Sequence, residues 1–254
     1  MRCSVVDFSE MGLRLRSVTA AKASWTIAVI LIAIQAAVSI GGGHDQLVWL
    51  FRNFGLSREG LLEGKLWQFL SYGLLHGGFL HVGLNAACIV LMGARIEHML
   101  GQAAVWKTMG FGIIGGGIAH VLLAPSIATY SPVLVGASGG CVALLILLTT
   151  LSPDSRMWPV PISGRALGIG ILGAELALAL IDPQPGLPGL SRIGEILASQ
   201  GLAGWFSVSH ACHFGGGVAG YVCGIWLLRP RVTTARLRRD RERREAKIAK
   251  SGGH

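Results

Sequence analysis

Two glycine-rich stretches place a hydroxyl and an imidazole inside otherwise apolar sequence. Ser138 stands within residues 136–140, Gly-Ala-Ser-Gly-Gly, and His213 is followed by Gly216 and Gly220. Glycines beside a serine let the chain turn tightly and bring bare backbone N–H groups to its hydroxyl. A bare glycine face on the histidine's helix lets a neighbouring helix approach closely. Because an imidazole can take the proton of a serine hydroxyl, the pair predicts Ser138 as nucleophile and His213 as general base.

A second pair of polar residues could stabilise the negative charge that a serine nucleophile creates. His81 and Asn85 are four residues apart, so they share one face of a helix. Both side chains can donate a hydrogen bond, as can the backbone N–H of Ser138. Donors aimed at developing negative charge form an oxyanion hole. We therefore expect one built from His81, Asn85 and the Ser138 N–H.

Each of these motifs also has a purely structural interpretation. Gly136 and Gly140 have the spacing of a helix-packing face, with Ser138 as a small residue between them. A histidine such as His213 can simply donate to a backbone carbonyl. A polar pair on one helix face can hydrogen-bond to a neighbouring helix. The residues alone leave both interpretations open.

The composition around these motifs is that of a membrane protein. Of the 254 residues, 52% are hydrophobic and 14% charged, whereas a soluble domain carries roughly 25% charged residues. Six apolar runs approach the ~20 residues that a helix needs to cross a ~30 Å hydrocarbon core. Continuous apolar runs in lipid favour helices, because helices satisfy their own backbone. The sequence predicts an all-α polytopic membrane protein with six spans, at about 25–41, 67–93, 103–124, 137–152, 166–182 and 209–228.

Charge placement predicts the orientation and the domain limits. With the N-terminus in the cytoplasm, cytoplasmic segments hold 18 of the 22 Lys and Arg, which fits the positive-inside rule. We expect a cytoplasmic segment 1–24, a membrane domain 25–228 and a basic cytoplasmic tail 229–254, in an inner or plasma membrane. Beside a membrane helix, such a tail favours anionic lipids over nucleic acid as a partner. Residues 25–41 could instead be a signal peptide, but their length favours a retained helix.

Helical rise places several polar residues at one depth. Ser138, His81 and His213 lie about 21–24 Å from the nearest cytoplasmic charge or proline along their helices. His120 falls in the same layer, so depth alone does not select the site. Glu175 lies only about 15 Å from Arg165 along its helix, deeper than the serine layer, and is expected to be a structural acid.

Several motifs, in their order along the chain, resemble those of the rhomboid family of intramembrane serine proteases. The similarity covers about residues 25–228. Each motif alone is weak, but the ordered set is specific. The matching stretches are GKLWQF at 64–69, LHGGFLHVGLN at 75–85, GARIEHMLG at 93–101, GASG at 136–139, and His213 with Gly216 and Gly220.

The resemblance implies a six-transmembrane-helix rhomboid-like bundle and a role for each matching position. Ser138 and His213 would form a catalytic dyad without an aspartate, with His81, Asn85 and the Ser138 N–H as oxyanion donors. His76 matches an outer histidine whose role is less defined. The remaining motif positions are Gly136, Gly139, Gly216 and Gly220. The implied activity needs no cofactor and no metal, and its substrates are transmembrane proteins cleaved in or next to their membrane segments.

Three residues near the motifs need separate treatment. The family usually has an aromatic residue one turn after the serine, where this chain has Val142. Glu175 has no counterpart in the resemblance. His210 precedes His213 by three residues, which places it about 60° around the helix and nearer the outer surface. We therefore expect His210 to tolerate alanine better than His213.

Two other classes of function remain. The first is a non-catalytic rhomboid-like binder of membrane proteins, which the Val142 departure keeps open. The second is a metal-binding membrane protein, for which the candidate ligands are His76, His81, His120, His210 and His213. Against the second, the acid at that depth is Asp182 alone, at the outer end of its helix.

Overall fold

The computed structural model describes residues 18–123, 133–157, 161–229 and 234–251, and it is helical throughout these ranges apart from turns and two isolated β-bridges. The prediction of an all-α membrane bundle is confirmed. The main helices are α2 (Lys22–Gly41), α6 (Phe79–Leu100), α7 (Gln102–Leu123), α8 (Ser138–Leu151), α9 (Gly164–Ile181) and α11 (His210–Leu228). Shorter elements are α3 (His44–Phe54), α4 (Arg58–Leu62), α5 (Gln68–Ser71), η1 (Tyr72–Leu74), α10 (Leu190–Leu197), η2 (Ala198–Leu202) and η3 (Ala203–Ser207), and α12 (Thr234–Ser251) follows α11.

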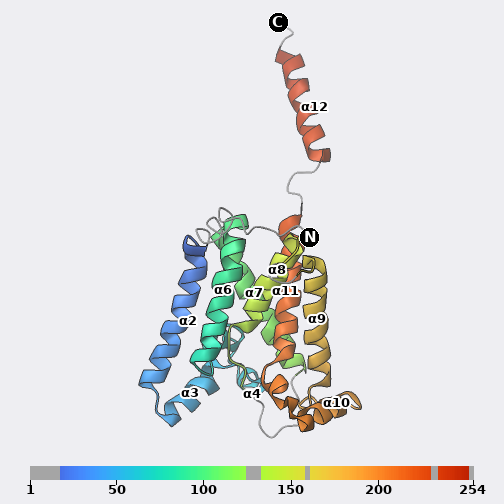
Figure 1. Ribbon diagram of the computed structural model, residues 1–254. Helices are drawn as coiled ribbons and strands as arrows, with labels where there is room; N and C mark the ends of the chain where they lie inside the picture. Colours follow the sequence, from blue (N-terminus) through green and yellow to red (C-terminus); the bar gives the residue numbers. More distant parts are fainter. Residues whose placement is uncertain (1–17, 124–132, 158–160, 230–233, 252–254) are drawn as a thin grey trace, which may run out of the picture.

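The main helices form a bundle around α8, which packs against α6, α7, α9 and α11 (Figure 1). Within the described residues, α2, α6, α9 and α11 are long and apolar enough to cross a membrane, and α8 is apolar but has only 14 residues. A 14-residue helix is ~21 Å long, so it falls short of a ~30 Å core. Because α8 is short, Ser138, the first residue of α8, lies inside the bundle rather than at the end of the bundle.

The short elements lie at one end of the bundle. Figure 1 shows α3, α4 and α10 at the lower end, where α6 and α11 begin. The opposite end holds the start of α2, the end of α11 and, beyond it, α12. Under the expected orientation, the lower end faces the outside of the cell.

The second expected span, 67–93, has different bounds in the structure. Its first part forms α5 and η1, and the long helix begins only at Phe79 and runs to Leu100. The helix stops at Gly101, whose φ of +83° is a conformation that glycine adopts most easily. Because α7 starts at Gln102, the stretch 94–102 between the second and third expected spans is helical almost throughout.

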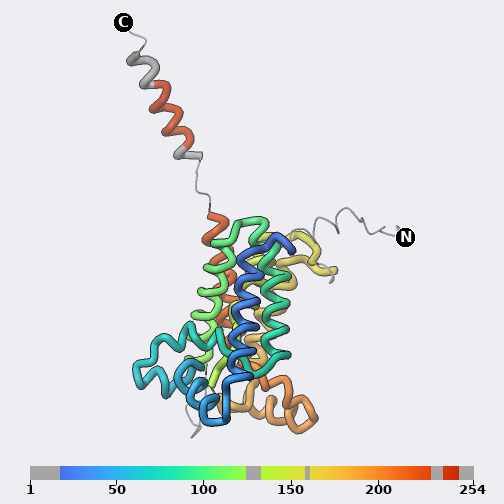
Figure 2. Tube along the Cα trace, turned by 90° about the vertical axis from the view of Figure 1, so that its left-hand side faces the viewer, coloured from blue at the N-terminus to red at the C-terminus, as the bar shows by residue number. Residues whose placement is uncertain are grey.

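Helix α2 is packed into the bundle beside α6, as both Figure 1 and Figure 2 show. Ile27 and Leu31 are buried in one cluster with Ile89. The Glu97 carboxylate accepts hydrogen bonds from the backbone N–H groups of Ala23 and Ser24, at 3.1 and 3.2 Å. These are first-turn amides that a helix cannot satisfy by itself. The contacts fit a retained helix better than a cleaved signal peptide.

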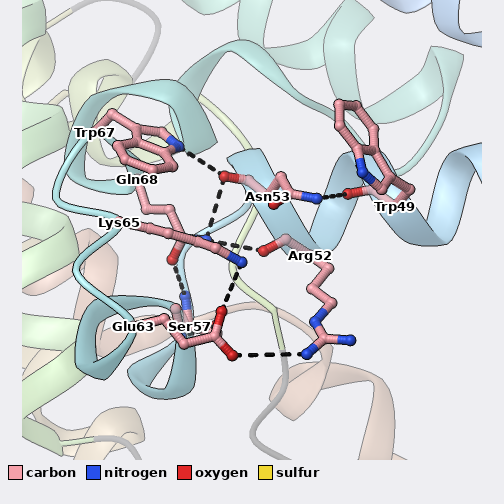
Figure 3. Close-up of polar contacts among 9 residues, drawn as sticks. Trp49, Arg52, Asn53, Ser57, Glu63, Lys65, Trp67 and Gln68 are labelled. Atoms are coloured by element: carbon pink, nitrogen blue, oxygen red, sulfur yellow. Dashed lines mark hydrogen bonds and ion pairs between the residues drawn. The ribbon is translucent and has the colours of Figure 1, made fainter.

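The loop between α2 and α6 is held by hydrogen bonds of the tryptophan and glutamine in the GKLWQF stretch (Figure 3). Gln68 is fully buried, accepts from Ser57 N–H at 3.2 Å and donates to the Arg52 carbonyl at 3.0 Å. Trp67 Nε1 donates to the Asn53 carbonyl at 2.8 Å. Lys65 lies 2.8 Å from Glu63, and its hydrogen bond lowers the pKa of that carboxyl. This part of the family-like sequence therefore shapes the loop between α2 and α6.

The loop between α9 and α11 contains a short amphipathic helix, α10, at Leu190–Leu197. Leu190, Ile193 and Ile196 on this helix are exposed, whereas Ser191 and Gly194 are buried against the chain. An apolar face that points away from the protein at this end suits the membrane interface.

Candidate active site

A cavity of about 530 Å³ lies toward the lower end of the bundle, among the first turns of α6, α8 and α11. Phe206, Val208 and Ser209, from the segment that leads into α11, also line the cavity. The structure brings to this cavity the four side chains that the sequence selected for chemistry, those of Ser138, His213, His81 and Asn85. The other polar and titratable side chains in the cavity wall include His120, His210 and Asp182.

Ser138 lies inside the bundle because residues 133–137, which lead into α8, are hydrogen-bonded to Leu56 and Tyr72. Leu134 forms an isolated antiparallel bridge with Leu56, with N–H···O distances of 2.8 and 3.0 Å. Gly136 N–H then donates to the Tyr72 carbonyl at 2.9 Å. Gly136 has φ of +120°, a conformation that other residues rarely adopt. The turn ends at Ser138, whose backbone N–H, in the first turn of α8, has no partner within the helix.

Glycines set the approach of α11 to α8, and so of His213 to Ser138. A Cβ added to Gly216 would collide with the Gly139 carbonyl, and one added to Gly220 with the Ala143 backbone. The two helix backbones therefore touch one turn after His213. Val142 faces this contact, with its Cγ1 beside Gly217. The glycine face predicted from the sequence does allow close helix packing.

The His81 and Asn85 side chains lie against the turn that precedes the serine. A Cβ at Gly136 would be 2.7 Å from the His81 ring and 3.7 Å from Asn85 Nδ2. Asn85 Oδ1 accepts a weak hydrogen bond from Cys141 Sγ at 3.7 Å. Asn85 Nδ2 is buried and has no hydrogen-bond partner among the described residues. A buried amide donor without a partner is costly, and such groups are rare unless they have a function.

His76 contacts the same turn from the other side. It is buried, and its Nε2 accepts a hydrogen bond from the Ala137 N–H at 3.4 Å. Its ring packs edge-on against His81, with centroids 5.0 Å apart. His76 therefore supports both the serine turn and the His81 ring, which gives this motif position a physical role.

His120 has a structural partner at the start of α11. Its Nδ1 lies 2.8 Å from the Ser209 hydroxyl, which also accepts from the Cys212 N–H as the N-cap of α11. An N-cap serine satisfies one of the free amides of the first turn. His120 therefore steadies the entry to α11, although it also lines the cavity.

Glu175 was misplaced by the depth estimate, which put it below the serine layer. Its carboxylate is 2.7 Å from His210 Nδ1 and 3.1 Å from His213 Nδ1. Counting 1.5 Å per residue from one charged residue ignores the tilt of each helix and the reach of a long side chain. Among the described residues, Glu175, His210 and His213 are also the group whose ligand atoms lie close enough to hold a metal ion, within 4.8 Å of one another. This group differs from the all-histidine set considered from the sequence.

The fold and cavity define a class of protein: a polytopic α-helical membrane protein with a cavity near one end of its bundle that a serine and several histidines line. A sequence model of the Rhomboid domain matches residues 63–230. The chain therefore belongs to the rhomboid family and is an integral membrane protein. It is 27% identical over 180 residues to RHOMBOID-like protein 5 of Arabidopsis thaliana, a match that covers 69% of this chain and 48% of the relative. The chain thus spans about half the length of that relative.

Proposed function

We propose that this protein is an intramembrane serine endopeptidase that cleaves peptide bonds in or next to transmembrane segments of membrane proteins. One observation carries the proposal: Ser138, His213 and the unpaired Asn85 amide line one cavity among apolar helices. A nucleophile, a base and an unused hydrogen-bond donor at one place are the elements of acyl transfer. Membership of the rhomboid family supports the same reaction.

In the first step, His213 takes the Ser138 hydroxyl proton while Oγ bonds to the scissile carbonyl carbon. The carbonyl oxygen becomes an oxyanion, which His81, Asn85 and the Ser138 N–H stabilise. His213 then gives the proton to the leaving nitrogen, the C–N bond breaks and an acyl-enzyme remains. Water gives a proton to His213, and its oxygen attacks the ester. The proton returns to Ser138 as the second product leaves, so the cycle needs no cofactor.

The test is cleavage of a transmembrane reporter by the protein in membranes. Ser138→Ala and His213→Ala should each abolish cleavage, because they remove the nucleophile and the base. Ser199→Ala and His98→Ala are matched controls, since both side chains are exposed and lie outside the cavity. All four variants should reach the parent's abundance in the membrane. Normal cleavage by either dyad variant would reject the assigned mechanism.

A non-catalytic rhomboid-like binder is the second candidate. The observation in its favour is Val142, which stands where relatives usually have an aromatic residue beside the histidine. Valine cannot stack on an imidazole, although it is stiff at χ1 and can still wall the ring. A binder would retain a membrane protein in the Ser138→Ala variant and in the parent alike, with no cleavage product from either.

We further propose that both termini are cytoplasmic and that the membrane is a cell inner or plasma membrane. The cavity then opens to the outside, where water can enter. The cytoplasmic partner of the tail 229–254 would be the anionic lipid surface, because ten of its residues are Lys or Arg. Transmembrane protein substrates would approach from within the bilayer.

A further inference from the structure

A mostly buried carboxylate joins the two histidines at the start of α11. Glu175 Oε2 lies 2.7 Å from His210 Nδ1, and Oε1 lies 3.1 Å from His213 Nδ1. His210 Nε2 lies 2.6 Å from the Trp205 carbonyl oxygen. The side chains of Glu175, His210 and His213 are only 18%, 8% and 16% exposed. Water therefore has little access to the cluster, and each short contact needs one donor and one acceptor.

The Trp205 carbonyl determines where His210 carries its proton. A carbonyl oxygen can only accept, so His210 Nε2 donates to it. His210 Nδ1 and Glu175 Oε2 must then share one further proton, because two lone pairs 2.7 Å apart would repel. Either His210 is an imidazolium beside a carboxylate, or it is neutral beside a carboxylic acid. In both cases the Glu175–His210 pair has no net charge.

The same conclusion follows for His213 in both cases. The proton of the pair lies between Oε2 and His210, so Oε1 is left as an acceptor. His213 Nδ1 must therefore carry a hydrogen and donate it to Oε1 across 3.1 Å. A proton on Oε1 would require one more proton in the cluster and leave a net positive charge with little exposure to water. The neutral His213 ring then has its lone pair on Nε2, the nitrogen needed as a base.

We propose that Glu175 is the positioning residue of the catalytic histidine, fixing its Nδ1–H tautomer and its orientation, with His210 setting which carboxylate oxygen accepts. The inference rests on the proposed function and extends the dyad by a third, buried group. Glu175 acts by accepting a hydrogen bond. His210 compensates its charge, so little electrostatic stabilisation of the His213 imidazolium remains.

Two substitutions at Glu175 separate these effects. Glu175→Gln keeps the hydrogen-bond pattern: its NH₂ donates to His210 Nδ1, and its carbonyl oxygen accepts from His213 Nδ1. Glu175→Leu has a similar volume but offers no acceptor. Glu195→Leu is the matched control, since Glu195 is exposed on α10. Each variant is compared with the parent for kcat and KM on a transmembrane reporter and for its melting temperature.

The inference predicts a kcat effect without a KM effect. Glu175→Leu should lower kcat by about 10²–10⁴, the scale seen when a catalytic histidine loses its tautomer. Glu175→Gln should retain kcat within about tenfold of the parent, and Glu195→Leu should match the parent. A structural role for the charge would instead impair both Glu175 variants alike. Equal kcat for Glu175→Leu and the parent would overturn the assignment.

A second comparison remains informative if Glu175→Leu does not accumulate. In a His210→Phe background, the glutamine introduced by Glu175→Gln loses the partner that orients its amide. The Gln substitution should then lower kcat more in that background than in the parent, a coupling that a double-mutant cycle measures. The same effect in both backgrounds would overturn the role of His210.

A readout that does not depend on catalysis distinguishes failure of this inference from failure of the proposed function. In ¹⁵N-histidine NMR, the His213 signal, identified by its loss in His213→Ala, should report a protonated Nδ1 in the parent. Glu175→Leu should remove that preference. An unprotonated Nδ1 in the parent would reject the inference even if cleavage occurs. A stoichiometric metal that the Glu175→Gln variant loses would also reject it, because the metal would occupy the Nδ1 lone pairs.

Discussion

At the scale of single residues, the side chains around Ser138 differ in whether their hydrogen-bonding atoms have partners. His120 has a structural partner in the Ser209 hydroxyl, and His76 Nε2 has one in the Ala137 N–H, but His76 Nδ1 is buried without a partner among the described residues. Asn85 Nδ2 is buried without one among the described residues. An unpaired buried donor costs stability, so a position in the cavity wall beside Ser138 fits a role with a bound substrate. The unpaired amide supports the proposed role of Asn85 as an oxyanion donor.

The Asn85→Ala variant tests this assignment. Turnover should fall by about 10²–10³, the usual cost of losing one oxyanion donor. The melting temperature should hardly change, because the substitution loses one weak hydrogen bond from Cys141 but also removes a buried NH₂ group that has no partner. Reporter cleavage and thermal unfolding are measured on the same preparation. If Asn85 is instead a packing contact between helices, the variant will lose stability and keep turnover within about twofold.

The residue types and spacings selected Ser138, His81, Asn85 and His213 because these stand in locally unusual sequence, and the structure places all four in the wall of one cavity. Glu175 could not be placed in the same way. Its contact depends on how α9 packs beside α11, and nothing local in the sequence encodes that arrangement. The signal that could have found it is an ionisable residue inside an apolar span, which is a functional candidate by default.

At the scale of elements, the site depends on close contact between α8 and α11. Most of the helix bounds follow from apolar run length, with errors of a residue or two. The second span was the exception: residues 67–78 are apolar enough to extend a helix, yet they fold as α5, η1 and a turn. Tertiary contacts decide this, including the Tyr72 carbonyl that accepts from Gly136 and shapes the serine turn.

Adding one methyl group to the α8–α11 contact should separate the two helices. A Cβ at Gly220 would meet the Ala143 backbone, which cannot move as a flexible side chain can. Gly220→Ala should cost about 1–3 kcal/mol, the range for overpacking, and lower the melting temperature. Gly170→Ala on α9 is the control, since nothing lies within 4 Å of its added Cβ. Equal melting temperatures for Gly220→Ala and Gly170→Ala would show that the contact is looser than described.

At the scale of the whole molecule, the two ends of the bundle differ in charge and in structure. The end with α3, α4 and α10 carries the cavity, and the opposite end leads to the basic α12 (Figure 1). A six-helix protein with both termini inside would expose the cavity to the outer water that hydrolysis needs.

Limited trypsin digestion of sealed vesicles tests this orientation. In inside-out vesicles, trypsin should remove the Arg-rich tail at 229–254, because the cytoplasmic face is accessible. In right-side-out vesicles the tail should be protected. Soluble marker proteins from the two sides of the membrane, assayed in the same vesicles, serve as controls for sealing. Removal of the tail from the outside would reverse the orientation and with it the side from which water reaches Ser138.

The central claim is that Ser138 is an activated nucleophile, and labelling by a fluorophosphonate tests it most directly. The reagent bonds to a serine only when a base activates the hydroxyl and an oxyanion site receives the phosphonyl oxygen. Peptide mapping of the membrane-embedded protein should find the label on Ser138, with no labelling of Ser138→Ala and almost none of His213→Ala. Absence of label in the folded parent protein, or labelling that persists in Ser138→Ala, would contradict the account.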